Sequence, residues 1–162
     1  MKHRIVDSPL GSLTLVVDET DALVALYVPG QSHGPEESGV DLGERDDTVA
    51  QAAVEQLAEY FAGARSRFSV RLSPTGTPFQ RRVWEALAEI PYGTTESYGR
   101  LAARIGSPRG TRAVGAAASR NPIGIIVPCH RLVGASGALT GYAGGLERKR
   151  WLLDFEAGGA LV

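Results

Sequence analysis

A short apolar run that stops at a proline, directly before the only cysteine, most constrains what this chain can fold into. Residues 123–128 read Ile-Gly-Ile-Ile-Val-Pro, and their apolar, β-branched character predicts a buried strand that the proline closes. Cys129 and His130 follow at once. A thiol at the end of a buried strand, beside an imidazole, is typical of a cysteine nucleophile. A lone cysteine is also common as a small core residue, and this stretch alone leaves both interpretations open.

Charge is distributed unevenly along the chain. Residues 1–96 hold 15 acidic and 8 basic side chains, whereas residues 97–146 hold no Asp or Glu and six arginines. An acid-free basic block of this length is typical of a surface that binds a polyanion such as nucleic acid. The alternative is a solvated basic surface whose counter-charges come from the acidic part of the chain. The six are Arg100, Arg104, Arg109, Arg112, Arg120 and Arg131.

Composition excludes several classes of protein. One cysteine in 162 residues rules out an internal disulfide and argues against a cysteine-rich zinc site. The N-terminus runs straight into an alternating strand pattern and lacks the apolar core of a signal peptide. No apolar run reaches the length needed to span a bilayer. We therefore expect a cytoplasmic protein with no membrane partner and no bound metal.

Residues 1–75 predict a first lobe with a small antiparallel sheet and one helix. Residues 29–47 have almost no apolar anchor, which is typical of a mobile loop. Thr48 is the predicted N-cap of a helix that Gly63 ends. The predicted strands cover residues 4–7, 12–17, 23–28 and 68–72.

Residues 76–162 predict a second, mainly helical lobe, so the expected fold class is α+β with two lobes. Thr77 and Pro78 supply the N-cap and the first residue of a helix. Two short helices then follow, over 97–105 and 107–120, and their Gly-containing connection predicts a helix-turn-helix.

The second of these short helices is unusual because six consecutive residues, 113–118, are Ala, Val or Gly. A helix with so little bulk can approach another backbone closely, which suits either a tightly packed core or a nucleic-acid groove. The arginines at its ends and at Arg112 favour the groove.

The last part of the chain adds a glycine-rich loop and a helix. Residues 134–145 are expected to wrap a flat ligand, with Tyr142 as a stacking surface. The final helix, predicted over 146–156, carries Glu156 at its end among apolar neighbours. A buried carboxylate needs a partner, and His130 is the natural candidate.

Three segments together resemble one known family. Pro-Cys-His-Arg at 128–131 stands with Asn121-Pro122 upstream and Gly-Tyr-Ala-Gly-Gly at 141–145 downstream. This combination resembles the O6-alkylguanine-DNA alkyltransferases, which repair DNA by accepting the alkyl group themselves. The resemblance extends over about residues 77–156 and to the turn at 7–11.

The resemblance implies a role for each residue of the cysteine site. Cys129 would be the alkyl acceptor, whose thiolate attacks the carbon attached to O6 of guanine. His130 would deprotonate the thiol through a bound water, Glu156 would orient His130, and Asn121 would brace the surrounding turn. Because a thioether does not hydrolyse, the protein would act once, as a methyltransferase without a cofactor.

The resemblance also implies how DNA is bound. A base must leave the duplex to reach a buried thiol, so base flipping is required. Arg112 would fill the gap in the base stack, and Tyr98 would help to rotate the nucleotide and donate toward guanine. The helix-turn-helix would enter the minor groove with little sequence specificity. The DNA- or substrate-binding residues expected are Tyr98, Arg112, Ala113, Gly115, Arg131, Tyr142, Ala143 and Gly144.

The partner implied is double-stranded DNA containing O6-alkylguanine, with O4-alkylthymine as a second substrate, bound by a monomer that is able to cluster on DNA. Ala143 departs from the family pattern, because some members have a serine there that contacts O6. Three alternatives stay open. They are a non-catalytic helix-turn-helix protein that binds DNA or lesions, a sequence-specific helix-turn-helix regulator, and a cysteine hydrolase with turnover.

Overall fold

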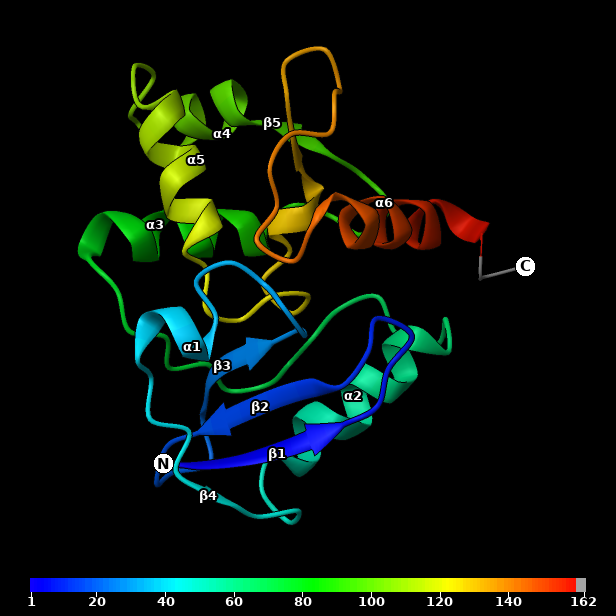
Figure 1. Ribbon diagram of the computed structural model, residues 1–162. Helices are drawn as coiled ribbons and strands as arrows, with labels where there is room; N and C mark the ends of the chain where they lie inside the picture. The colour runs from blue at the N-terminus through cyan, green and yellow to red at the C-terminus, as the bar shows by residue number, and fades with distance from the viewer. Residues whose placement is uncertain (160–162) are drawn as a thin grey trace. The chain divides into compact units, whose positions relative to one another are not determined.

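Two units make up the computed structural model, which describes residues 1–159 (Figure 1). The first unit contains residues 1–75 and 122–124, and the second contains residues 76–121 and 125–159. Residues 122–124 join the first unit because the Leu26 N–H donates to the Pro122 carbonyl at 2.8 Å. The units divide between residues 75 and 76, where the lobe boundary was expected, and residues 122–124 are the exception. Residues 160–162 of the predicted second lobe lie outside the described residues.

A four-stranded sheet organises the first unit, in the order β3-β2-β1-β4. β2 pairs antiparallel with both β1 and β3, as predicted, and Leu13, Leu15 and Val16 of β2 are fully buried. The β1–β2 turn ends at Gly11, whose φ of +104° favours glycine. The strands are β1 (Lys2–Val6), β2 (Leu13–Val17), β3 (Leu23–Tyr27) and β4 (Glu44–Arg45).

The segment 29–47, predicted to be a mobile loop, contains regular structure. It forms a short helix, α1 (Pro35–Ser38), and its β4 pairs parallel with β1. Nδ1 of His3 lies 3.2 Å from the Leu42 carbonyl oxygen and 3.1 Å from that of Gly43. The prediction failed because backbone pairing with β1 and the packing of Leu42 against a buried cluster of the sheet hold this segment.

One helix, α2 (Gln51–Phe61), packs on the sheet, and its Leu57 lines a small hollow together with Val6 and Leu13. The predicted N-cap is wrong, because the Thr48 hydroxyl donates to Asp46 instead. The helix begins after Ala50, which has the left-handed φ of +57°.

The predicted strand over 68–72 is wrong, whereas the predicted helix stop at Gly63 is confirmed. Residues 68–72 form no strand and make only an isolated parallel bridge between Leu72 and Leu23. Gly63, with a φ of +77°, follows the end of α2 as predicted.

Helices dominate the second unit. The helix α3 (Pro78–Ala88) begins with the predicted Thr77 cap, which forms a capping box with Gln80. Trp84 of α3 is buried, and its Nε1 donates to the Ala117 carbonyl at 2.8 Å. This bond joins α3 to the second helix of the helix-turn-helix.

The helix-turn-helix consists of α4 (Tyr98–Arg104) and α5 (Thr111–Ser119). Ser97 caps α4, since its side chain accepts from the Arg100 N–H. The predicted start of α5 at Ser107-Pro108 is wrong, because these residues form a turn and Gly110 precedes the first helical residue.

A parallel pair of two-residue strands links the start of α4 to the cysteine segment. β5 (Glu96–Ser97) pairs with β6 (Leu132–Val133), so that Ser97 lies opposite Val133. The described part of the chain ends with α6 (Leu146–Asp154) and one π-helical turn, η2 (Phe155–Gly159). No helix within residues 1–159 is long and apolar enough to cross a membrane.

Candidate active site

The segment that carries the cysteine is a series of turns, and the predicted strand over 123–128 is absent. Ile125 has the left-handed φ of +70°, and residues 129–131 form a single turn of 3₁₀-helix, η1 (Cys129–Arg131). The apolar residues are buried as expected, but a short apolar run does not distinguish a strand from a buried turn. Cys129 and His130 therefore lie on a helical turn and not on extended backbone.

Asn121 braces this turn from the end of α5. Its Nδ2 donates to the Val127 carbonyl at 2.9 Å and to Sγ of Cys129 at 3.3 Å. Both side chains are buried. An amide that donates to sulfur stabilises the thiolate more than the thiol.

The thiol of Cys129 is poised between opposing influences. Burial raises its pKa, while the Asn121 hydrogen bond and the positive charge of Lys149 lower it. The balance is a raised pKa, so the resting protein holds a protonated thiol and needs a base to form the nucleophile.

His130 is completely buried and pairs with Glu156, as the sequence predicted. Its Nε2 lies 2.8 Å from Oε2 of Glu156. Because a carboxylate only accepts, Nε2 carries the proton and Nδ1 is left with a lone pair. Nδ1 is buried and has no hydrogen-bond partner among the described residues. Burial lowers the pKa of His130, which keeps the ring neutral and able to accept a proton.

Arg131 lies in the interior of the second unit, so its predicted role in binding DNA or substrate is wrong. Its side chain is buried, with Nε donating to Oε1 of Glu156 at 2.7 Å and a second nitrogen donating to Oε2 at 2.9 Å. A third donor reaches the Ile90 carbonyl at 2.7 Å. The two hydrogen bonds from the guanidinium neutralise the Glu156 carboxylate that holds His130, so Arg131 belongs to the interior of the site.

A lysine that sequence reasoning missed lies at the centre of the second unit. Lys149 is completely buried, and its Nζ donates to the Leu132 carbonyl at 2.6 Å and to the Thr140 carbonyl at 3.2 Å. Its position three residues before the buried Leu152, on the inner side of α6, is the signal that could have identified it.

Tyr98 and the glycine-rich loop meet through Thr140. The Thr140 hydroxyl donates to the Tyr98 hydroxyl at 2.9 Å. Farther along the loop, Tyr142 and Ala143 are half-buried and Gly144 is buried. Burial, and then the negative charge of ionised Cys129, raise the pKa of Tyr142 well above its ordinary value.

The helix α5 presents small residues to solvent. Arg112 and Ala113 are exposed, whereas Val114, Ala117 and Ala118 are buried and hold the helix on the rest of the unit. Gly115 faces Tyr98, since a Cβ at Gly115 would lie 3.7 Å from that ring.

The six arginines of the acid-free block fall into two groups. Arg104 forms ion pairs with Glu89 and Glu96, and Arg131 binds Glu156, so acidic residues from outside the block neutralise these two. The other four are exposed and form no ion pair among residues 1–159; they are Arg100, Arg109, Arg112 and Arg120.

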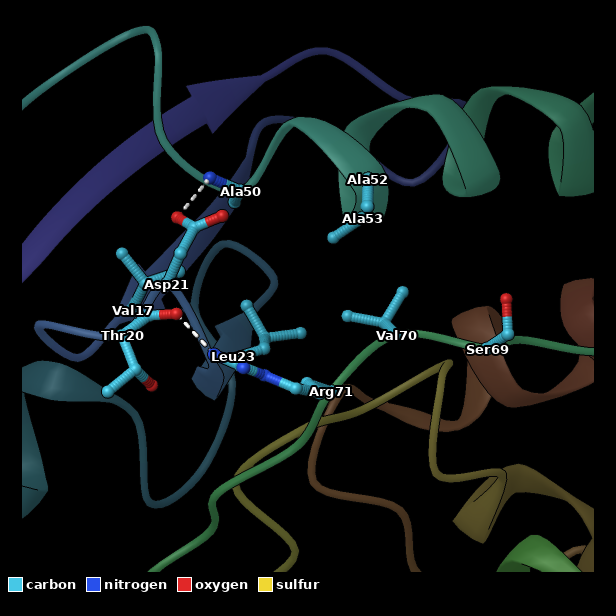
Figure 2. A pocket seen from close by; sticks show the side chains of 10 residues that line it. All are labelled: Val17, Thr20, Asp21, Leu23, Ala50, Ala52, Ala53, Ser69, Val70 and Arg71. Carbon is cyan, nitrogen blue, oxygen red and sulfur yellow. Dashed lines mark hydrogen bonds between the residues drawn. The ribbon is translucent and has the colours of Figure 1, made fainter.

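A separate hollow of about 370 Å³ lies in the first unit (Figure 2). In it, Asp21 accepts from the Ala50 N–H at 2.9 Å and Arg71 donates to the Thr20 carbonyl, so backbone groups engage both charged side chains. None of its ten lining residues is a cysteine or a histidine. No group of acidic, histidine or cysteine residues suited to a metal ion occurs among the described residues.

Comparison with known proteins decides the family. Residues 1–74 match the model of the 6-O-methylguanine DNA methyltransferase ribonuclease-like domain, and residues 78–158 match that of the 6-O-methylguanine DNA methyltransferase DNA-binding domain. The chain belongs to this family. The 6-O-methylguanine DNA methyltransferase match thus covers both units and includes every predicted site residue.

Individual members of the methyltransferase family resemble the chain over nearly its full length. A methylated-DNA–protein-cysteine methyltransferase of Mycobacterium tuberculosis H37Rv is 49% identical over 159 residues, covering 95% of this chain and 91% of that protein. The corresponding protein of Methanosarcina acetivorans is 46% identical over 156 residues, covering 96% and 98%. The crystal structure of M. tuberculosis OGT in complex with DNA matches with a TM-score of 0.90 at 47% identity, covering 98% of this chain and 94% of that one.

Proposed function

We propose that the protein repairs DNA by moving the alkyl group of O6-alkylguanine, and of O4-alkylthymine, irreversibly onto Cys129. One observation carries the proposal: the only cysteine of the chain is buried beside His130, whose Nε2 binds Glu156 and whose Nδ1 keeps a free lone pair. This is the arrangement of nucleophile, base and orienting carboxylate that covalent catalysis requires. The names of the relatives, methylated-DNA–protein-cysteine methyltransferases, support the same reaction.

The proton leaves Cys129 for His130. The structure contains no direct hydrogen bond between Sγ and the imidazole Nδ1, so one bridging water carries the proton between them. Asn121 donates to the sulfur as its negative charge develops. Arg131 keeps Glu156 in place and ionised, so that the carboxylate holds His130 in the tautomer that accepts at Nδ1.

The transfer itself forms one bond and breaks one. The thiolate attacks the alkyl carbon, an S–C bond forms, and the electron pair of the C–O6 bond passes to guanine. Guanine takes up one proton from water, and the imidazolium of His130 releases to water the proton that it took from the thiol, so the protons balance. The Tyr98 hydroxyl donates a hydrogen bond toward the guanine ring. The reaction needs no cofactor, and the thioether product ends the activity of that molecule.

DNA binds at the helix-turn-helix. The exposed face of α5, with Arg112 and Ala113, is small enough to enter the minor groove, where the degenerate pattern of base edges gives little sequence specificity. Arg112 then fills the gap that the flipped nucleotide leaves, and the loop residues Tyr142, Ala143 and Gly144 receive the base. One chain supplies all of these groups, so the protein acts as a monomer.

Label transfer tests the proposal. Duplex DNA with a labelled O6-methylguanine should transfer its methyl group to the wild-type protein and not to Cys129→Ser, while both proteins bind the duplex equally. A non-catalytic helix-turn-helix protein, the second candidate, would bind the duplex without acquiring label. Transfer to Cys129→Ser would contradict the assignment of the acceptor.

A further inference from the structure

Lys149 is a buried charge with no anion beside it. No part of the residue is exposed, and the acceptors of Nζ are two neutral carbonyls, those of Leu132 and Thr140. No carboxylate within residues 1–159 lies within ion-pair distance of Nζ. Because a buried ammonium is costly unless it is paired, its presence here calls for an explanation.

The ammonium joins three segments of the site. Leu132 directly follows η1, the turn that carries Cys129. Thr140 lies two residues before Tyr142 and donates its hydroxyl to Tyr98. Nζ itself lies 5.9 Å from the centre of the Tyr98 ring. One side chain therefore ties the cysteine turn, the glycine-rich loop and the start of α4 together.

The charge of Lys149 has a matching anion only when Cys129 ionises. The helix α6 packs against η1. Burial lowers the pKa of Lys149, and the ionised sulfur of Cys129 opposes this effect. The lysine in turn lowers the pKa of Cys129. The other charged side chain on the cysteine turn, Arg131, already binds the Glu156 carboxylate.

The remaining titratable groups near this pair are His130, Tyr98, Tyr142 and Arg148. His130 is neutral, because burial lowers its pKa. The Tyr98 hydroxyl is held by Thr140, and Arg148 donates to the Gly144 carbonyl at 3.0 Å. Burial raises the pKa of Tyr142, ionised Cys129 raises it further and Arg148 opposes both, so this hydroxyl stays neutral.

We infer that Lys149 is a positioning residue of the alkyl-transfer site, whose ammonium fixes the loop against Tyr98 and neutralises the thiolate of Cys129 as it forms. The inference rests on the proposed function. An ammonium has three N–H donors, of which the two carbonyls take two. A compact ammonium suits this site, where a planar guanidinium would need more space. Of the 17 basic residues in the chain, only Lys2 and Lys149 are lysines.

The thiol titration of three variants tests the inference. The single cysteine can be titrated by thiolate absorbance, with the spectrum of Cys129→Ser subtracted to remove the tyrosine signal. Lys149→Met should raise the thiol pKa by about one unit or more and slow single-turnover methyl transfer at neutral pH about tenfold, since one pKa unit is a tenfold change in thiolate. Lys149→Arg, which keeps the charge, should raise the thiol pKa less. Lys2→Met should show the thiol pKa and the transfer rate of the wild type.

The outcomes separate this inference from the proposed function. Wild-type transfer together with an unchanged thiol pKa and rate in Lys149→Met would overturn the inference alone, whereas absence of transfer in wild type would overturn the proposed function. If Lys149→Met does not fold, Lys149 can be titrated by NMR without replacing it. The protein labelled with ¹³C at Cε of lysine gives two signals, one from Lys2 and one from Lys149. The Lys149 signal should then titrate at lower pH in Cys129→Ser than in wild type, and equal titration would contradict the inference.

Discussion

The Glu156 carboxylate binds His130 and Arg131 at the same time, with Oε2 lying 2.8 Å from Nε2 of His130 and 2.9 Å from a guanidinium nitrogen of Arg131. Burial first, and then the positive charge of Arg131, lower the pKa of His130 against the opposing effect of the carboxylate, so the imidazole stays neutral. Glu156 therefore orients His130 without protonating it, which leaves the imidazole able to act as a general base.

Glu156→Gln should slow methyl transfer about tenfold to a hundredfold, because an amide no longer fixes the His130 tautomer and leaves Arg131 without its counter-charge. Breaking a buried ion pair should also reduce the free energy of unfolding by about 3–5 kcal/mol. Single-turnover rates and urea unfolding measure the two effects. Asp154→Asn, an exposed change at the end of α6, serves as the control. A wild-type rate in Glu156→Gln would show that the carboxylate does not orient the base.

Stability should fall in mildly acidic solution because of His130. Burial lowers the pKa of this ring in the folded protein below its ordinary value of 6.5. The unfolded chain therefore takes up a proton first as the pH falls, and the free energy of unfolding decreases from about pH 6.5 down to the folded pKa. Urea unfolding between about pH 7.5 and about pH 5.5 should show a smaller pH dependence in His130→Gln than in wild type. An equal dependence in both proteins would contradict a buried, neutral His130.

Asn121 should affect the thiol directly. Asn121→Ala removes the donor to sulfur and should raise the pKa of Cys129, while Asn121→Asp adds a negative charge beside the thiolate and should raise it further. The pH profile of iodoacetamide alkylation, which Cys129 alone can show, measures both shifts. A profile of Asn121→Asp that matches wild type would exclude electrostatic contact between this side chain and the sulfur.

Arg112 and Arg131 should behave in opposite ways. Arg112→Ala should leave stability unchanged but slow repair in duplex DNA more than reaction with the free alkylated base, because only the duplex needs its stack supported. Arg131→Met should instead destabilise the fold by about 3–5 kcal/mol, since it leaves Glu156 buried without its cation. Thermal unfolding and rates on both substrates separate the two. Arg67→Ala, an exposed arginine of the first unit, is the control. Equal slowing on both substrates in Arg112→Ala would rule out its role in flipping.

Local signals in the sequence explain which elements were predicted correctly. The Thr77 cap followed by Pro78 and the alternation in β2 each act over a few residues, so the printed sequence already contains them. β4 carries no such signal, because its pairing with β1 uses backbone groups of residues more than forty positions away. The apolar run before Cys129 was predicted to be buried, and it is, but apolarity alone does not fix the backbone conformation.

The same distinction applies to the site. The pairing of His130 with Glu156 followed from the need of a buried carboxylate for a partner, and the structure contains it. Arg131 was assigned to DNA because its charge was counted without knowing its burial, and Lys149 was missed for the same reason. Whether a cation is exposed or enclosed depends on tertiary contacts, which a single sequence does not contain.

The mass of the intact protein after reaction tests the central claim most directly. Wild-type protein mixed with excess duplex that contains O6-methylguanine should gain one methylene per chain, mapped by peptide analysis to Cys129. The reaction should then stop at one equivalent of repaired DNA. Repair of more than one equivalent per chain, or a methylene on any other residue, would contradict stoichiometric transfer to Cys129.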